Sequence, residues 1–345
     1  MDKQALEMTA NALIAHGKGI LAIDESFATI GRRFESISVA NSERNRRSYR
    51  ELLVSCPGIE RYVSGMILFD ETLRQPGARR PRLVEPLFER AIHAGIKVDT
   101  GAKAMAGHPG EQITEGLDGL RERLCEYHAL GATFAKWRAV IAVDGNALPS
   151  AGCIEANAHA LARYSAMCQE AGLVPIVEPE VLMDGNHSID RCAQVTDAAL
   201  RAVFAQLRAQ RVHLEGVILK SNMVVPGASV RRRPSAEQVA ERTIQTLRGA
   251  VPAAVPGVVF LSGGQSEVDA TARLNAMNLT ANHPWTLSFS FGRALQDGAL
   301  KAWAGKAKNA RTAQAALLRR AGLNSAACFG RYSQEMEMAQ QCPTP

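Results

Sequence analysis

Short apolar runs recur along the chain, each separated from the next by a longer segment of mixed polarity. Eight such runs lie at residues 19–23, 63–69, 95–98, 133–137, 173–177, 216–219, 258–261 and 286–289. Continuous apolarity over so few residues is typical of strands that are buried on both faces of a parallel sheet. The segments between the runs have room for one helix and two loops each.

These intervening segments carry helix signals. Ser150 precedes an amphipathic stretch, and Ser235 with Gln238 forms the sequence pattern of a capping box. Asn41 and Ser42 are candidate caps of the first helix. Strands that alternate with helices predict a parallel sheet, and eight such units predict a closed barrel.

Two absences support the barrel over a doubly wound nucleotide-binding sheet. The chain has no Gly-x-Gly-x-x-Gly fingerprint after the first run and no Gly-Lys-Ser/Thr phosphate loop. No shift in composition marks a second domain. We therefore predict an α/β fold with a single (β/α)8 TIM barrel over residues 1–345, ending in a short, mobile tail from about residue 330.

Composition narrows the class of protein. The 345 residues are 46% hydrophobic, which allows an ample core, and the formal net charge is +6. Arginine clusters at 46–47, 79–82 and 231–233 are not interleaved with aromatic residues, so we expect solvated surface charge and no nucleic-acid partner. The excess positive charge would help to recruit an anionic substrate.

Cysteine and histidine usage indicates neither disulfides nor metal. The seven cysteines are odd in number and form no Cys-x-x-Cys pair, which is typical of reduced thiols in the cytoplasm. The eight histidines show no His-x-x-x-His or His-x-His spacing, so we expect no metal and no cofactor. No apolar window is long enough for a transmembrane helix, and the N-terminus lacks a signal-peptide core, so we expect no membrane partner.

Polar residues gather where the apolar runs end, and in such a barrel these ends share one rim. They are Asp24, Glu25 and Ser26 for the first run, Asp70 and Glu71 for the second, Lys97 for the third, Lys136 and Arg138 for the fourth, Glu178 and Glu180 for the fifth, Lys220 for the sixth, Ser262–Gln265 for the seventh and Ser290–Arg293 for the eighth. One charged residue at a strand end usually marks the return to solvent. Amines, carboxylates and phosphate-type donors at so many ends predict an active site, although the acids after the second run receive no role.

Lys220 is the candidate nucleophile. A buried sheet gives an ammonium little solvation, and repulsion from two further lysines on the rim also favours the neutral amine, which can attack a carbonyl and form a Schiff base. Glu178 and Glu180 share a face if their strand continues, and we expect one of them to be protonated and the other ionised, as acid–base catalysis requires. The glycines at 263 and 264 and Arg293 are suited to binding phosphate.

With these residues in hand, the chain resembles the class I fructose-bisphosphate aldolases along nearly its whole length. Seven motifs in register make the resemblance specific, at residues 17–26, 95–99, 134–138, 174–180, 219–224, 260–267 and 289–296. It implies a metal-independent lyase of glycolysis and gluconeogenesis that reversibly splits D-fructose 1,6-bisphosphate into glycerone phosphate and D-glyceraldehyde 3-phosphate. Members of the family are commonly homotetramers, so the resemblance implies a homotetramer.

The resemblance also implies a role for each site residue. Lys220 would be the Schiff-base lysine, and Glu178 the acid–base group that helps the carbinolamine to lose water and then takes the C4 hydroxyl proton. Lys136 would orient the C2 and C4 oxygens, and Asp24, supported by Glu180, would hold Lys220 and the reacting hydroxyl. The implied phosphate ligands are Ser262, Gly263, Gly264, Ser290, Gly292 and Arg293 on the C1 side, and Ser26, Arg33, Arg46, Lys97 and Arg138 on the C6 side.

The chain departs from the family pattern at three places. Ser221 replaces a usual proline, Arg32 replaces the lysine of a Lys-Arg pair, and the tail after Tyr332 lacks the terminal tyrosine that assists proton exchange at C3 in animal members. We therefore expect the three-carbon ketone to leave more slowly than the aldehyde, and the choice between the bisphosphate and fructose 1-phosphate stays open.

Three alternative functions compete with this one. One is the same chemistry on another sugar phosphate such as sedoheptulose 1,7-bisphosphate. Another is a metal-dependent lyase, which chelator resistance would exclude. The third is a scaffold for actin-like or other acidic partners, which is disfavoured because a scaffold has no need of Lys220, Glu178, Lys136 or Asp24.

Overall fold

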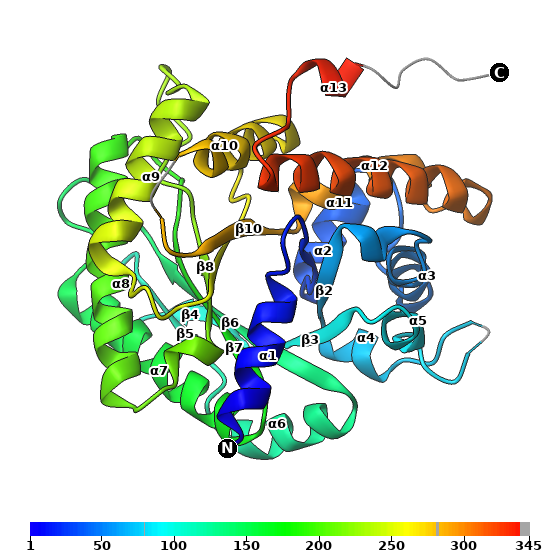
Figure 1. Cartoon of the computed structure of the whole chain (residues 1–345), viewed down its shortest axis with the longest axis horizontal. Helices are drawn as coiled ribbons and strands as arrows, with labels where there is room; N and C mark the ends of the chain where they lie inside the picture. The colour runs from blue at the N-terminus through cyan, green and yellow to red at the C-terminus, as the bar shows by residue number, and fades with distance from the viewer. Residues whose placement is uncertain (79, 281–282, 339–345) are drawn as a thin grey trace.

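The computed structural model describes residues 1–78, 80–280 and 283–338, and its centre is a closed barrel of parallel strands (Figure 1). The barrel strands are β1 Gly19–Ile23, β2 Val63–Leu68, β3 His93–Lys97, β6 Ala132–Ile141, β7 Val174–Val181, β8 Ile218–Ser221, β9 Gly257–Phe260 and β10 Thr286–Phe291. They follow chain order around the barrel, and β10 closes it by pairing with β1. The predicted (β/α)8 barrel is confirmed.

Helices surround the barrel and connect its strands. They are α1 Lys3–Leu13, α2 Phe27–Glu35, α3 Glu43–Val54, α4 Asp70–Arg74, α5 Glu85–Glu89, α6 Leu120–Ala129, α7 Ala151–Glu170, α8 Ile189–Ala209, α9 Ala236–Ala250, α10 Glu267–Leu279, α11 Arg293–Trp303, α12 Ala310–Cys328 and α13 Glu335–Met338. Ser150 caps α7 and Ser235 forms the capping box of α9 with Gln238, as predicted. Ser42 caps α3, but two helices precede it, so it does not begin the first helix. None of the described helices is both long and apolar enough to cross a membrane.

Alternate residues of the strands fill the barrel interior. An apolar cluster joins Ile20, Phe134, Ile176 and Ile218 from four strands with residues of α1, whose buried face contains Leu6, Ala10 and Leu13. Figure 1 shows α1 lying across the barrel in front of the strands. Helix α1 therefore closes the amino-terminal end of the barrel and makes its floor apolar.

The same alternation places charges directly above that floor. Lys136 comes two residues after Phe134, Glu178 two after Ile176 and Lys220 two after Ile218, and successive inward positions on a strand are two residues apart. Strands β6 and β7 run on to Ile141 and Val181, beyond the apolar runs that predicted them. They continue because their charged side chains face the cavity while their outward neighbours stay apolar.

The connection between β3 and α6 contains an unpredicted hairpin. Strand β4 (Gly101–Ala104) pairs antiparallel with β5 (Gln112–Glu115), outside the barrel sheet. Its composition is poor in strand-forming residues, so the hairpin depends on its own pairing and on packing against the rim. The hairpin forms one wall of the cavity described below.

The chain after α12 folds back along that helix. The Arg320 guanidinium donates to both Glu337 oxygens at 2.7 and 2.9 Å, and the Tyr332 hydroxyl donates to Glu337 Oε1 at 2.9 Å. These contacts fix the first part of the predicted tail as far as α13. Residues 339–345, the rest of that tail, lie outside the described residues.

Gly95 in β3 leaves room for a large side chain inside the barrel. A Cβ at this position would come within 2.1–2.6 Å of the Phe134 ring. We expect Gly95→Ala to lower the free energy of unfolding by about 1–3 kcal/mol through overpacking. Gly298→Ala in α11, where a Cβ meets nothing within 4 Å, should raise it by about 0.5–1 kcal/mol. Urea unfolding of both variants checks this pair, and equal effects would contradict it.

Candidate active site

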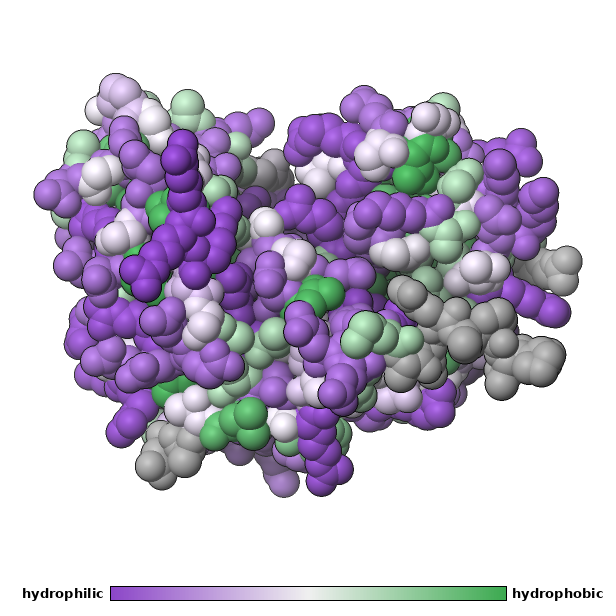
Figure 2. Space-filling view, turned by 90° about the horizontal axis from the view of Figure 1, so that it is seen from above, coloured by the Kyte–Doolittle hydropathy of each residue, from purple (hydrophilic) through white to green (hydrophobic). Residues whose placement is uncertain are grey.

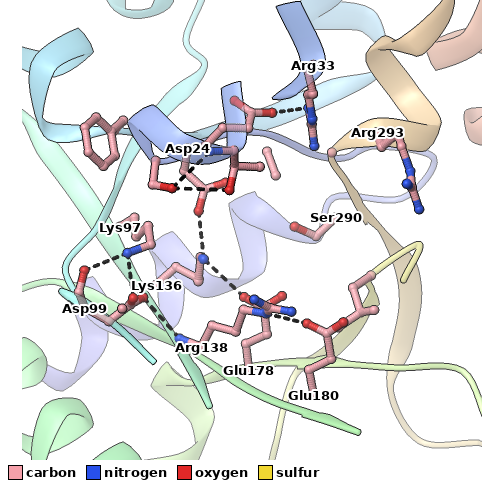
Figure 3. Close-up of a pocket in the computed structure, with 18 of the residues that line it drawn as sticks. Asp24, Arg33, Lys97, Asp99, Lys136, Arg138, Glu178, Glu180, Ser290 and Arg293 are labelled. Atoms are coloured by element: carbon pink, nitrogen blue, oxygen red, sulfur yellow. Dashed lines mark hydrogen bonds and ion pairs between the residues drawn. The ribbon is translucent and has the colours of Figure 1, made fainter. Parts of the chain in front are cut away.

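A cavity of about 1090 Å³ opens at the carboxyl ends of the barrel strands. Figure 3 shows its charged side chains converging from several strands and from the last turn of α2, which carries Arg33. Fifteen of the sixteen predicted site residues line it: Asp24, Ser26, Arg33, Lys97, Lys136, Arg138, Glu178, Glu180, Lys220, Ser262, Gly263, Gly264, Ser290, Gly292 and Arg293. The fold therefore brings nearly all of the predicted residues together.

Four of these side chains form a line of alternating charge. Lys136 Nζ lies 2.7 Å from Asp24 Oδ2 and 3.3 Å from Glu178 Oε2, and Lys220 Nζ lies 3.1 Å from Glu178 Oε1. Lys136, Glu178 and Lys220 are each no more than 4% exposed. Two cations and two anions thus share one buried layer, and their charges balance.

This arrangement keeps the two carboxyl groups ionised. Burial alone would raise the pKa of Asp24, but the opposing charges of Lys136 and Lys220 outweigh it and hold the pKa at about 2. Burial also opposes ionisation of Glu178, and the same two lysines lower its pKa below the usual value. For Lys136, burial is outweighed by Asp24 and Glu178, which raise its pKa. Lys136 is therefore a fixed cation in the free protein.

The low pKa of Asp24 makes part of the folding stability depend on pH. A carboxyl group with a lower pKa in the folded state stabilises the protein above its unfolded pKa, and that contribution is lost as pH falls through the folded pKa. The shift from 3.8 to about 2 is worth about 2 kcal/mol. Between about pH 6 and about pH 3, the stability difference between the wild type and Asp24→Asn should shrink by about 1 kcal/mol in urea unfolding. A constant difference would contradict this.

Two further ion pairs stand beside the line of charges. Lys97 Nζ lies 2.5 Å from Asp99 Oδ1, and Arg138 Nε lies 2.5 Å from Glu180 Oε2. Glu178 and Glu180 do share one face of β7, because the strand continues as far as Val181. Each of them nevertheless faces a cation, so the geometry gives no sign of a proton held between two carboxylates.

One side of the cavity offers donors without protein partners. Ser290 Oγ is buried and has no hydrogen-bond partner among the described residues, and Gly292, the N-cap residue of α11, provides no side-chain cap. The first N–H groups of a helix are free for an anion, and the helix dipole favours one there. Gly264 has a φ of +76°, and a Cβ would come within 2.7 Å of Met183 Sδ, so the turn requires glycine. This side can hold a phosphate group.

Arg33 lies on that same side of the cavity. A Cβ on Gly292 would be 3.6 Å from Arg33 Nη2. The guanidinium is paired with Glu25, whose Oε1 also accepts from Gln296 Nε2 at 2.7 Å. Figure 3 shows Arg33 near Ser290 and Arg293 and away from Lys97 and Arg138. The C6-side position expected from the resemblance therefore differs from the observed one.

Arg46 is the predicted site residue that the fold does not bring into the cavity lining. Its guanidinium makes hydrogen bonds of 2.9 and 2.7 Å to the two oxygens of Glu71 and lies over the Phe27 ring. These contacts satisfy the charge within the protein and hold the side chain away from the cavity. Ser26 does line the cavity, and its hydroxyl also accepts from Thr29 N–H as the cap of α2.

The described residues offer little to a metal ion. They contain no group of three or more histidine, cysteine, aspartate or glutamate side chains that could hold one. The cavity carboxylates already face lysine or arginine. The donor set suits a phosphorylated carbonyl compound.

Comparisons with known proteins agree with this geometry. The family model for fructose-bisphosphate aldolase class-I matches residues 5–343. The chain belongs to the class I fructose-bisphosphate aldolase family. It is 54% identical over 333 residues to a probable fructose-bisphosphate aldolase class 1 of Xanthomonas axonopodis pv. citri, covering 96% of this chain and 99% of that protein.

Other members of the family extend the likeness. The chain is 51% identical to the cytosolic fructose-bisphosphate aldolase 4 of Arabidopsis thaliana, covering 97% of this chain and 86% of that protein. A solved aldolase of Plasmodium falciparum, crystallised with TRAP and a small-molecule inhibitor, superposes with a TM-score of 0.94 at 47% identity. That match covers 96% of this chain and 95% of the solved one.

In this class I aldolase, the sequence interpretation gave Asp99 and Glu25 no role. Asp99 accepts from Lys97 Nζ and, at 3.3 Å, from the backbone N–H of Arg138, so it holds one cavity cation directly and fixes the backbone that carries another. The sequence does contain a sign of the Lys97–Asp99 pair, because the two residues are two positions apart and an extended chain places both side chains on one face. Glu25 gave no such signal, since its partners Arg33 and Gln296 belong to two different helices.

Proposed function

We propose that Lys220 is the nucleophile with which this aldolase cleaves D-fructose 1,6-bisphosphate to glycerone phosphate and D-glyceraldehyde 3-phosphate. The observation that carries the proposal is the position of Lys220 Nζ, buried and 3.1 Å from Glu178 Oε1. An amine at this site reaches a carbonyl in the cavity, and the adjacent carboxylate can exchange a proton with it.

The line of charges supports the activation of Lys220. Transfer of one proton from Lys220 to Glu178 leaves an amine beside a carboxylic acid and does not change the total charge of the four groups. The amine attacks the C2 ketone, and Glu178 then gives its proton to the departing hydroxyl of the carbinolamine. Water leaves, and an iminium joins C2 to Lys220.

Cleavage follows from the iminium. Glu178, again a carboxylate, takes the proton of the C4 hydroxyl, the C3–C4 bond breaks, and its electron pair moves into the iminium as an enamine. The aldehyde D-glyceraldehyde 3-phosphate forms from C4. Protonation at C3 and hydrolysis of the iminium then release glycerone phosphate and regenerate Lys220. Lys136, ion-paired with Asp24, stabilises the oxygens at C2 and C4 as they gain charge.

The two ends of the cavity suit the two phosphates. We assign the C1-phosphate to the Ser262–Gly264 turn, Ser290, Gly292 and Arg293, and we add Arg33 to this group because it lies against Gly292. Lys97 and Arg138, held by Asp99 and Glu180, stand at the opposite side and are assigned to the C6-phosphate. Ser26 is assigned to the same substrate through its place in the lining, and Arg46 is left out.

Location and assembly are parts of the same proposal. Named cytosolic relatives, such as the one from Arabidopsis thaliana, support a cytoplasmic enzyme. The homotetramer implied by the family resemblance stays a prediction, which light scattering after size-exclusion chromatography tests.

Borohydride trapping with fructose 1,6-bisphosphate in the presence of a chelator tests the mechanism. Borohydride reduces the iminium to a stable amine, so peptide mass mapping should find a sugar-phosphate adduct on Lys220. An adduct on another lysine would overturn the assignment. Loss of turnover with chelator and no adduct would favour a metal-dependent lyase, and neither adduct nor turnover would favour the scaffold alternative.

A further inference from the structure

Arg273 on α10 is a buried cation that the aldolase reaction does not use. The residue is 8% exposed, and its Nη1 donates to Gln265 Oε1 at 2.7 Å. Among the described residues no carboxylate lies within salt-bridge distance of it; Asp269, one turn earlier, acts on it only from farther away. Buried charges are normally paired, so an unpaired guanidinium points to a ligand that is not protein.

The free edge of this guanidinium is open to such a ligand. Nη1 is taken by Gln265, whereas Nε and Nη2, which form the other edge of the planar fork, have no protein acceptor among the described residues. Neither atom is among the polar atoms fully enclosed without a partner, so both can be reached from outside. This edge matches two oxygens of a phosphate group.

The charge of a second arginine acts on Arg273. Arg233, in the loop that precedes α9, is fixed by a 2.7 Å hydrogen bond from its Nη2 to the Ala228 carbonyl. Burial lowers the pKa of Arg273, Asp269 opposes this, and the nearby positive charge of Arg233 lowers it further. Arg233 is itself exposed, so water screens part of the repulsion between the two charges, and a bound anion would relieve the rest.

The surroundings add to the positive field. Arg231 and Arg232 are exposed in the same loop. Figure 2, which views the molecule from above, shows strongly hydrophilic side chains over the side on which α9 and the loop before it lie in Figure 1. None of these arginines lines the active-site cavity, so they are not part of the substrate's own phosphate sites.

We propose that Arg273 and Arg233 form a second anion site, behind the Ser262–Gly264 turn, that binds a small phosphate-bearing ligand. Arg273 is recessed, so a flat acidic protein surface does not reach its free edge, whereas a phosphate group does. Gln265 links the site to the active centre, because it bonds Arg273 through its side chain and Ser262 O through its N–H at 2.8 Å.

Calorimetric titration with inorganic pyrophosphate tests the site once the active-site cavity has been filled. Saturating hexitol 1,6-bisphosphate fills it, because this compound carries both phosphates but has no carbonyl with which to form a Schiff base. One pyrophosphate should still bind. Arg273→Gln should weaken that binding by at least about tenfold, since a hydrogen bond to a charged group is worth about 1.5–3 kcal/mol. Arg233→Gln should weaken it in the same direction.

Arg248→Gln is the matched control. Arg248 is exposed near the end of α9. Its substitution by glutamine removes the same charge as the other two substitutions, so this variant should bind pyrophosphate like the wild type. No binding after the cavity is filled, binding that survives Arg273→Gln and Arg233→Gln, or equal loss in Arg248→Gln would overturn the proposal. Because the measurement needs no turnover, its outcome is independent of the role proposed for Lys220.

Discussion

Lys220→Arg should lower kcat for cleavage of fructose 1,6-bisphosphate by at least about 10⁴-fold, the order of loss expected when a covalent nucleophile is removed. Arginine stays protonated in proteins and does not form a Schiff base, so the covalent route is closed. The substitution keeps a cation facing Glu178, 3.1 Å away in the native pair, and therefore does not leave a buried carboxylate unpaired. The loss would then report on the missing amine and not on a disturbed charge balance.

The assay for this variant combines two measurements. Steady-state turnover gives kcat, and borohydride trapping followed by mass mapping gives the amount of covalent adduct, which should be absent. Lys103→Arg is the matched control, because Lys103 is exposed on β4 and outside the cavity lining. Activity of Lys220→Arg within tenfold of the wild type, or an adduct on a different lysine, would refute the role of Lys220.

The barrel and its layer of reacting side chains could be predicted, because both follow from the alternation of side-chain direction along a strand, which repeats every two residues. Strand residues that alternate between core and cavity place Lys136, Glu178 and Lys220 above apolar neighbours two positions earlier, and this pattern is local in the sequence. The ends of β6 and β7 were predicted too early, because charged residues were taken as the return to solvent.

What the sequence did not reveal depends on contacts between distant segments. Arg46 is held by Glu71, and nothing near either residue indicates that pairing. Hairpin β4–β5 contains Gly101 and other weak strand formers, so only its tertiary pairing identifies it. Arg33 follows β1, yet it reaches the β10 side because those two strands are neighbours in the closed barrel. Closure itself is not a local property.

Glu178→Gln should lower kcat by about 10²–10⁴-fold, the usual contribution of a positioned acid–base group. Glutamine keeps the shape and an oxygen near Lys136 and Lys220, but it neither accepts the Lys220 proton nor gives one to the departing hydroxyl. It also removes one of the two anions that balance the two lysines, so the ammonium form of Lys136 loses one of its partners. The formation of the iminium should therefore slow as well as the cleavage step.

Glu180→Gln separates this role from a general effect of charge. Glu180 lies two residues later on the same face of β7, but its partner is Arg138, at 2.5 Å, and not a reacting lysine. We expect Glu180→Gln to raise KM through a less well held Arg138, with kcat within about tenfold of the wild type. Single-turnover trapping should show slow adduct formation in Glu178→Gln only. If kcat fell further in Glu180→Gln than in Glu178→Gln, the acid–base role would belong to Glu180. The proposed proton transfer between Lys220 and Glu178 would then be wrong.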